Sequence, residues 1–509
     1  MPPEVGPTVG KFLDMVAANR RHVTSRYHRE PRSIRFDEFR QVVRRYRPSE
    51  LLPALGELAA ASSPLAGSVD DILGAPPWAI AVAARESILW GNEHRDAEVD
   101  AEALRLIFNA QNSLDEGLSQ DTVADFLVRT AYLQFPYQES IYEEVARSHA
   151  LLVEGAAEMQ TEVLNDDAWT DVLGAPLGQV VGATFFLHSA AYANRGWVDP
   201  NWLDRDDLWP IYAVWPKEVI LRRLDDLSAT IADLRVAYAA VPHPPAGFER
   251  YAYNPLVRRP FIRLDGGRFL APQPRLILPT ITPASLYYAG INRFDQSFSR
   301  DVGHLTEHYV GKQLRSIDPG ITVHPEIAYR DGKQHLMSVD WFIDLPSTLV
   351  LVEVKSVRFG LLERAGFGDY EDDVRTLLNK SARQLERSAA AIEDGREEFA
   401  HLPQHKPRLG IIVTGEPYYL GNSPWFRDLV TTPPPFPTLT ASLRDVEHLA
   451  QLELADVERQ LTTSAGDPER STWNLGVALD GDLGTRDNSV LRRGWNSYPW
   501  PKPLDAAEG

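Results

Sequence analysis

The sequence predicts an α/β core with a mixed sheet, preceded by a large and mainly α-helical region. Amphipathic segments with apolar residues at three- and four-residue spacing fill most of residues 8–240. Between residues 295 and 416 the patterns follow the order helix, strand, strand, strand, helix, strand. The chain has 509 residues, more than one hydrophobic core usually holds, so two or three domains are expected.

The composition is that of a globular protein without disulfides. Hydrophobic residues make up 44% and charged residues 24% of the chain, and the absence of cysteine excludes disulfides and thiolate metal sites. The first residues lack the basic-then-apolar order of a secretory signal. The most apolar segment, 176–193, is broken by Gly, Gln and His, which favours a buried helix over a membrane span. We therefore expect a cytoplasmic protein that does not contact a membrane.

The charge distribution limits how the chain meets nucleic acid. Its net charge of −19 argues against a surface that coats nucleic acid unselectively, so any such contact must be local. Residues 20–47 contain ten arginines against three acids, and Arg44 and Arg45 are candidate phosphate contacts. A solvated helix face is the more ordinary explanation of this segment.

Residues 1–245 are predicted to form the helical region, whose role the sequence does not define. Helices are expected at 121–135, 140–159 and 217–241. Residues 246–294 form a connector that contains a short hairpin turning at 265–267, where Asp-Gly-Gly favours a tight turn. The helical region would recognise the substrate, a protein partner or a second copy of the chain.

Residues 295–435 are predicted to form the α/β core. Prolines near 433–437 end this unit, and a helix at 439–462 with an irregular tail completes residues 436–509. The elements expected in the core are a helix at 297–316, strands at 320–329, 336–344 and 348–356, a helix at 371–394 and a strand at 408–414.

The run STLVLVEVKSV (347–357) departs from the pattern of a buried strand. Valines occupy one face, and the other face begins with Leu349 and Leu351. That second face continues with Glu353 and Lys355, two charges that are costly to bury unless they are paired or bound to a metal. Taken alone, they fit an ion pair at a strand end.

A second carboxylate is expected beside Glu353. A tight turn at 346–347 would place position 344 opposite 349 and Asp340 opposite Glu353. Two facing carboxylates repel each other and favour a cation between them, and Lys355 lies on the same face. Carboxylate oxygens with a nearby ammonium suit Mg²⁺ or Mn²⁺ together with a phosphate.

The two helices of the core add further polar residues. Glu307 shares its helical face with Gly303, Val310 and Gly311, which should pack closely on the sheet. Lys380 and Gln384 lie one turn apart at the margin of the apolar stripe of the second helix. Either side chain could reach a phosphate or a metal-bound water, although a solvated position is the more common one for each.

The order of these residues resembles the PD-(D/E)XK nuclease superfamily with its restriction-endonuclease-like core. The resemblance covers residues 295–416, about a quarter of the chain, and Val339 stands where the family has its proline. It rests on the helix–three strands–helix–strand order and on Glu307, Asp340, Glu353-Val354-Lys355 and Gln384.

The resemblance implies a role for each matching position. Asp340, Glu353 and the backbone carbonyl of Val354 would bind Mg²⁺ or Mn²⁺. Glu307 would hold a second metal or a metal-bound water. Lys355 would orient and activate the attacking water or stabilise the charge on phosphorus, and Gln384 would position the site.

The sequence thus favours a metal-dependent nuclease that cuts phosphodiester bonds, in DNA rather than RNA. Bacterial defence against foreign DNA, or repair, is the expected setting. The alternative is a binding or scaffold protein of a nucleic-acid-processing complex that keeps the nuclease fold without the chemistry. No HExxH motif, glycine-rich phosphate loop or paired-histidine motif supports another hydrolase.

Overall fold

The structure is a computed structural model that describes residues 33–62, 75–115, 123–356, 358–365, 367, 370–479 and 486–501. The described residues form two compact units. The N-terminal unit contains those up to Ile141, Leu173–Ser285 and those from Tyr498 onward, and the α/β unit contains Tyr142–Val172 and Leu286–Ser497. The chain therefore combines a helical region with a mixed α/β core, as the sequence predicts.

Helices form most of the N-terminal unit. Leu51 and Leu55 of one helix pack with Ile80 and Ile88 of another in a fully buried core. The predicted helix at 121–135 is present from residue 123, and its first two residues lie outside the described ranges. The first helices are α2 (Phe36–Val43), α3 (Pro48–Ala61), α4 (Pro77–Trp90), α5 (Ala101–Asn112) and α6 (Val123–Gln134).

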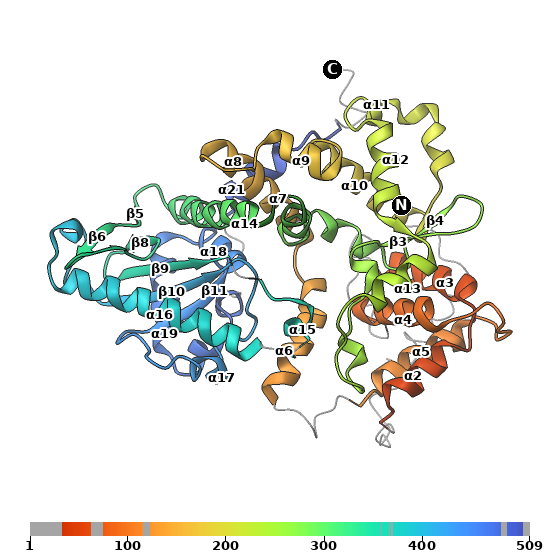
Figure 1. Ribbon diagram of the computed structural model, residues 1–509, viewed down its shortest axis with the longest axis horizontal. Helices are drawn as coiled ribbons and strands as arrows, with labels where there is room; N and C mark the ends of the chain where they lie inside the picture. The colour runs from red at the N-terminus through yellow and green to blue at the C-terminus, as the bar shows by residue number, and fades with distance from the viewer. Residues whose placement is uncertain are drawn as a thin grey trace. The chain divides into compact units, whose positions relative to one another are not determined.

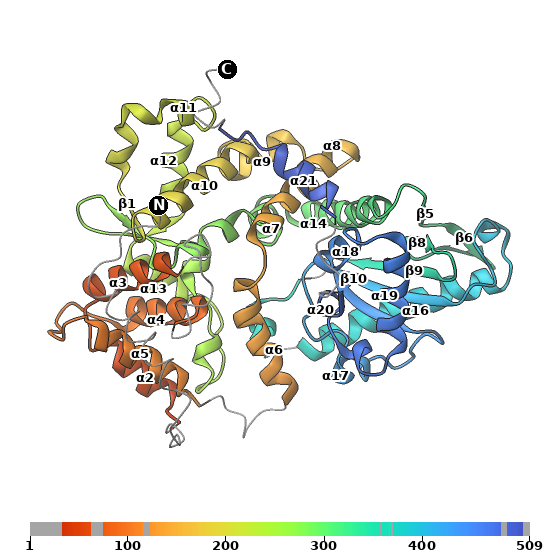
Figure 2. The same cartoon turned by 180° about the vertical axis from the view of Figure 1, so that it is seen from behind.

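The expected buried helix at 176–193 is α10 (Leu177–Ala193). It lies beside α12 (Lys217–Asp226), as Figures 1 and 2 both show. Leu187 of α10 and Ile220 of α12 are fully buried in the same apolar cluster.

No single helix in the described ranges is long and apolar enough to cross a membrane. The helices α9 (Asp166–Leu173) and α10 together pass this test, which considers only length and composition.

Two predictions for this unit need correction. The helix expected at 217–241 is broken at residues 227–230, where β2 (Ser228–Ala229) separates α12 from α13 (Ile231–Ala239). Thr230 starts α13 as a capping box with Asp233.

The predicted hairpin is confirmed as β3 (Phe261–Arg263) and β4 (Phe269–Leu270). It belongs to a four-stranded sheet in the order β1-β4-β3-β2, in which β1 is Trp197–Val198. Residues 246–285 are therefore part of the N-terminal unit and not a separate connector.

The helix predicted at 140–159 is continuous but belongs to the α/β unit. It consists of α7 (Ile141–His149), a π-helical turn (Ala150–Glu154) and α8 (Gly155–Glu158). Buried polar contacts attach the residues that follow this segment to the core. The carboxylate of Asp301 accepts the backbone N–H groups of residues 162, 163 and 164 at 2.8–2.9 Å. A chain boundary at residue 245 therefore does not describe this fold.

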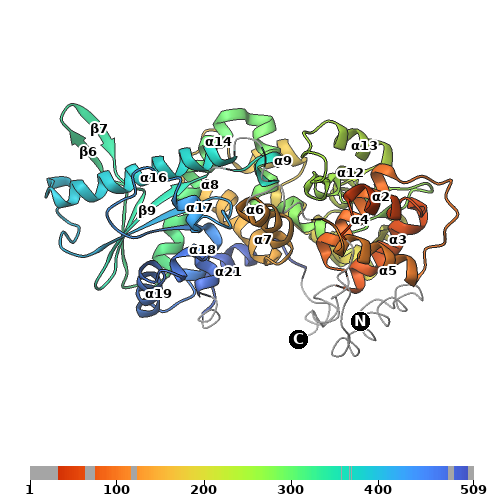
Figure 3. The same cartoon turned by 90° about the horizontal axis from the view of Figure 1, so that it is seen from below.

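The core of the α/β unit is a five-stranded mixed sheet in the order β11-β10-β9-β8-β5. The strands β5 and β9 are antiparallel to β8, whereas β9, β10 and β11 are parallel. Figure 3 shows α16 (Tyr370–Glu393) on one side of β9 and α19 (Leu454–Gly466) on the other. The strands are β5 (Thr322–Pro325), β8 (Trp341–Asp344), β9 (Leu349–Lys355), β10 (Arg408–Thr414) and β11 (Thr438–Ser442).

The predicted core helices and several strands agree closely with the structure. The helix before the sheet is the second part of α14 (Pro283–Ser316), which is interrupted at Asp295 with φ 53°. The strands expected at 320–329 and 336–344 are shorter, because residues between them form a separate hairpin of β6 (Ala328–Asp331) and β7 (Gln334–Met337). Gly332, with φ 60°, lies in its turn.

The C-terminal part of the prediction is wrong in two places. Residues 438–442 form β11, not the start of a helix, and its parallel pairing with β10 extends the core sheet beyond residue 435. Ser442 then caps α18 (Leu443–Leu449). The described tail is also not irregular, since it contains α20 (Leu475–Leu479) and α21 (Ser489–Asn496). Residues 480–485 and 502–509 lie outside the described ranges.

Two short helices, α15 (Leu361–Arg364) and α17 (Pro424–Arg427), complete the α/β unit.

Candidate active site

The candidate site lies where β9 continues beyond the end of β8. The ladder between these strands pairs Asp344 with Leu349 and Trp341 with Val352, which confirms the predicted register. The ladder stops before Asp340, so Asp340 and Glu353 are not a ladder pair. Instead, Asp340 Oδ2 accepts the backbone N–H of Val354 at 2.6 Å.

The backbone carbonyl of Val354 faces the same edge as Asp340. The N–H and C=O groups of one strand residue point to the same side, and the Val354 N–H is bonded to Asp340. The neighbouring carbonyl of Lys355 points the other way and accepts from Gly415 N. The predicted backbone ligand therefore lies next to the Asp340 carboxylate.

Glu353 and Lys355 form an ion pair, the arrangement that the two charges taken alone suggest. Lys355 Nζ donates to Glu353 Oε1, and the Glu353 side chain is 0% exposed. Glu353 Oε2 is buried and has no hydrogen-bond partner among the described residues. A buried carboxylate oxygen without a partner is costly, so this oxygen is the atom of the site best suited to accept a cation or a proton.

Glu307 reaches the site from α14, whose glycine face packs on the sheet as predicted. A side chain at Gly311 would collide with the indole of Trp341. Trp341 Nε1 donates to the backbone carbonyl of Glu307 at 2.9 Å. The guanidinium of Arg315 lies 4.5 Å from the centre of the Trp341 ring, one further contact between α14 and β8.

Glu326 is a site residue that sequence reasoning missed. The strand β5 pairs with β8 up to Pro325 opposite Trp341, so the next step places Glu326 opposite Asp340. Glu353 lies on the neighbouring β9, where the N–H of the next residue, Val354, is bonded to Asp340. The three acids therefore lie near one another at one end of the sheet, and the charge of Asp340, after burial, raises the pKa of both Glu326 and Glu353. The pairing of β5 with β8 was the signal that could have revealed Glu326.

The acids of this site hold their protons more strongly than isolated carboxyl groups. Burial, and then the charge of Asp340, raise the pKa of Glu353 to about 8 against the attraction of Lys355. Burial, followed by Asp340 and Glu326, raises the pKa of Glu307 to about 7. The pKa of Asp340 and that of Glu326 are also raised, with burial as the main cause in both. The site thus carries more acidic groups than it can leave charged without a cation.

Gln384 positions the segment before Asp340. Its Nε2 donates to the backbone carbonyl of Ser338 at 2.8 Å. The backbone N–H of Val339 donates to Ser388 Oγ at 2.9 Å, one turn further along α16. Ser338 Oγ accepts from Ile327 N at 2.8 Å, which connects this segment to the residue after Glu326. These bonds hold Asp340 and Glu326 beside each other.

The remaining predicted residues lie outside this network. Lys380 is exposed on α16 and has no ion-pair partner among the described residues. In the N-terminal unit, Arg35 and Arg40 pair with acids, whereas Arg44 and Arg45 form no ion pair in the part of the chain that the structure describes. Residues 20–32 of the basic segment lie outside the described ranges.

The donor atoms fit a divalent cation through oxygen ligands. In the described ranges, no three His, Cys, Asp or Glu side chains are grouped closely enough to hold a metal ion. Two carboxylates and one carbonyl remain, namely Glu353 Oε2, Asp340 and the backbone of Val354. Such hard oxygen donors suit Mg²⁺ or Mn²⁺, which keep several waters in their coordination shell.

Comparisons with protein-family models, with curated proteins and with solved structures find no match to this chain.

Proposed function

We propose that this protein is a divalent-metal-dependent nuclease of the PD-(D/E)XK type, with DNA as its substrate. The observation that carries the proposal is the meeting of Asp340, Glu353 and Lys355 at the point where β8 ends and β9 continues. The order of the five-stranded sheet and its mixed strand directions support a restriction-endonuclease-like core. The position of Glu307 on the helix packed against β8 supports it as well.

The residues have separable tasks in phosphodiester hydrolysis. Asp340, Glu353 Oε2 and the Val354 carbonyl would hold Mg²⁺, and the bound metal would supply positive charge for the phosphate and an acidified water. Lys355 lies on the same face, where its ammonium can neutralise charge that grows on the phosphate oxygens. Gln384 keeps the Asp340 segment in place.

The reaction itself is a hydrolysis. The attacking water gives up a proton as its oxygen forms a bond to phosphorus, the bond to the leaving oxygen breaks, and the leaving oxygen takes up a proton. Glu307, whose pKa is raised to about 7, would accept or return such a proton near neutral pH.

Cleavage assays with point variants test the proposal. Purified protein with Mg²⁺ or Mn²⁺ is incubated with plasmid, linear and single-stranded DNA and with RNA. Asp340→Asn, Glu353→Gln and Lys355→Met should each abolish cleavage of the substrate that the wild type cuts. The matched control is Asp344→Asn, at the other end of β8, where Asp344 pairs with Lys406 and cleavage should be retained.

Two results would contradict the proposal. Equal cleavage by the wild type and Glu353→Gln would show that another site, or a contaminant, cuts the substrate. Binding of nucleic acid without any cleavage, with either metal, would favour the scaffold alternative, in which the same fold binds without reacting.

A further inference from the structure

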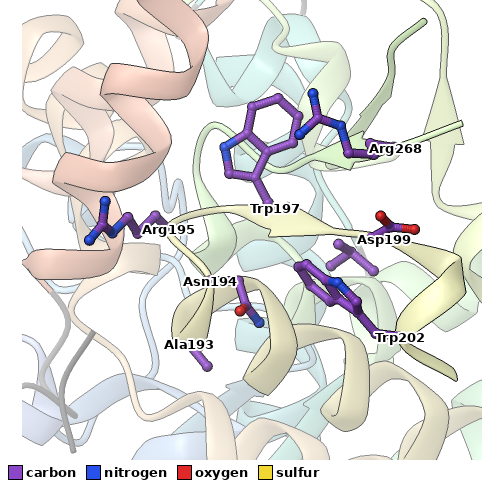
Figure 4. A pocket seen from close by; sticks show the side chains of 8 residues that line it. Ala193, Asn194, Arg195, Trp197, Asp199, Trp202 and Arg268 are labelled. Atoms are coloured by element: carbon purple, nitrogen blue, oxygen red, sulfur yellow. The ribbon is translucent and has the colours of Figure 1, made fainter. Parts of the chain in front are cut away.

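A cavity in the N-terminal unit is lined by aromatic and charged side chains. Its volume is about 520 Å³, which lies within the usual range of small-molecule sites. Two tryptophans, Trp197 and Trp202, line it together with Arg268, Asp199 and Asn194 (Figure 4). The cavity is formed wholly by residues of the N-terminal unit, so the inference does not rest on the proposed nuclease function.

Trp197 and Arg268 form one wall. Trp197 belongs to β1 and pairs with Leu270 of β4, which brings residue 268 beside it. The guanidinium of Arg268 lies 4.6 Å from the centre of the Trp197 ring, and Figure 4 shows the two side chains next to each other. Arg268 has no ion-pair partner among the described residues, although the chain is strongly acidic. An exposed cation without an acid partner, placed on an aromatic face, is available for an anion.

Trp202 and Asp199 also line the cavity. Both come from the chain that follows β1, where Pro200–Asp204 makes a 3₁₀ turn. Asp199 Oδ1 accepts from Asn201 N at 2.9 Å, which fixes the start of this turn. Trp202 N donates to the carbonyl of Asp199 at 3.0 Å, so the indole and the carboxylate are held on one short segment.

The turn before β1 has two residues with positive φ, directly before Trp197. Arg195 has φ 57° and Gly196 has φ 92°, both in the left-handed region. A side chain at Gly196 would lie 2.7 Å from the carbonyl oxygen of Ala271, so glycine is needed there. Arg195 also lines the cavity, but it points away from the tryptophans in Figure 4 and lies 3.8 Å from Glu57, whereas Arg268 has no ion-pair partner among the described residues.

We propose that this cavity binds a nucleobase that carries a phosphate. Indole faces stack on bases of any sequence, and a guanidinium recognises a phosphate through parallel hydrogen bonds. The Asp199 carboxylate offers an acceptor for an amino group of the base. Such a unit is present both in a free nucleotide and in a single strand of nucleic acid.

Calorimetric titrations in EDTA, which prevents cleavage, test the proposal on the full chain. The probes are AMP, adenosine, inorganic phosphate and an oligodeoxyadenosine of about 12 nucleotides, a length within the site sizes of single-strand-binding proteins. Trp197→Ala and Trp202→Ala should each weaken binding about tenfold, as expected for the loss of one stacking surface. Arg268→Gln should weaken AMP but leave the affinity for adenosine unchanged.

Matched controls separate binding from folding. Trp209→Ala removes a tryptophan that is 70% exposed on α11 (Trp209–Tyr212) of the same unit, and it should leave binding unchanged. Trp202→Phe keeps an aromatic face and should retain most of the affinity. The titrations are run in EDTA and the cavity lies wholly in the N-terminal unit, so their outcome does not depend on whether the chain cuts nucleic acid.

The results distinguish the two sources and can overturn the proposal. AMP that binds as tightly as the oligonucleotide indicates a free nucleotide, and an oligonucleotide that binds without AMP indicates a base within a strand. The proposal is wrong if neither probe binds at millimolar concentration. It is also wrong if folded Trp197→Ala and Trp202→Ala bind as the Trp209→Ala control does.

Discussion

Replacing Glu353 by glutamine should make the metal-free protein more stable in alkaline solution while abolishing cleavage. The Glu353 side chain is fully buried, and its pKa is raised from 4.5 to about 8. Below about pH 4.5 the folded and unfolded states both carry the proton. Between this pH and about 8 the folded protein keeps a proton that the unfolded chain has released, so the free energy of unfolding falls as the pH rises.

The size of the effect follows from this interval. Stability changes by about 1.4 kcal/mol per pH unit for one proton, so the loss for Glu353 reaches about 5 kcal/mol by pH 8. Glutamine does not ionise and avoids that loss. This loss already includes the attraction of Lys355, which lowers the pKa of Glu353. We therefore expect Glu353→Gln to be more stable than the wild type by several kcal/mol, at most about 5, near pH 9.

Unfolding by urea in EDTA measures this difference at about pH 5 and about pH 9. A separate urea titration with Mg²⁺ in place of EDTA identifies the unfolding transition to compare: it is the one whose midpoint Mg²⁺ moves to a higher urea concentration in the wild type. In Glu353→Gln, Mg²⁺ should not move this midpoint. Asp344→Asn serves as a control that removes a carboxylate from the same sheet. Parallel pH profiles for the wild type and Glu353→Gln would refute the reasoning, because they would mean that Glu353 does not titrate in this range.

Three further variants address residues that the structure places around the site or on the basic segment. Glu326→Gln removes one of the acids beside Asp340 and should therefore weaken Mg²⁺ binding, measured by calorimetry at neutral pH. Unchanged Mg²⁺ binding would exclude Glu326 from the site. Gln384→Ala removes one hydrogen bond to the segment before Asp340, so it should lower the cleavage rate about fivefold to tenfold and leave the protein folded. An unchanged cleavage rate would contradict the positioning role of Gln384. Arg44→Ala combined with Arg45→Ala should reduce the slope of log affinity for DNA against log salt by about 2, and an unchanged slope would remove this segment as a phosphate contact.

Local patterns in the sequence were sufficient for the main elements of the α/β core. The alternation of residues 408–414 predicted β10 at its observed bounds, and the apolar stripe of the second helix predicted α16 to within one residue. The turn between β8 and β9 also fixed the register that brings Asp340 next to Glu353 and Val354. Each of these features depends on residues that are near one another in the chain.

Contacts between distant segments decided the rest. The strand β11 was taken for a helix because a short parallel edge strand is stabilised by its partner β10 and not by its own pattern. Residues 142–172 join the α/β unit because the carboxylate of Asp301 satisfies three of their backbone N–H groups. Neither pairing has a signal within the segment itself.

The sequence by itself determined the candidate chemistry, since it contained Asp340, Glu353 and Lys355 at the spacing of two paired strands. Only the tertiary structure decided which other groups share their surroundings. It added Glu326 through the pairing of β5 with β8, and it turned Gln384 toward the backbone of Ser338. The physical reason is that strand order and helix packing arise from burial summed over the whole core, whereas periodicity reports only which face of each element is apolar.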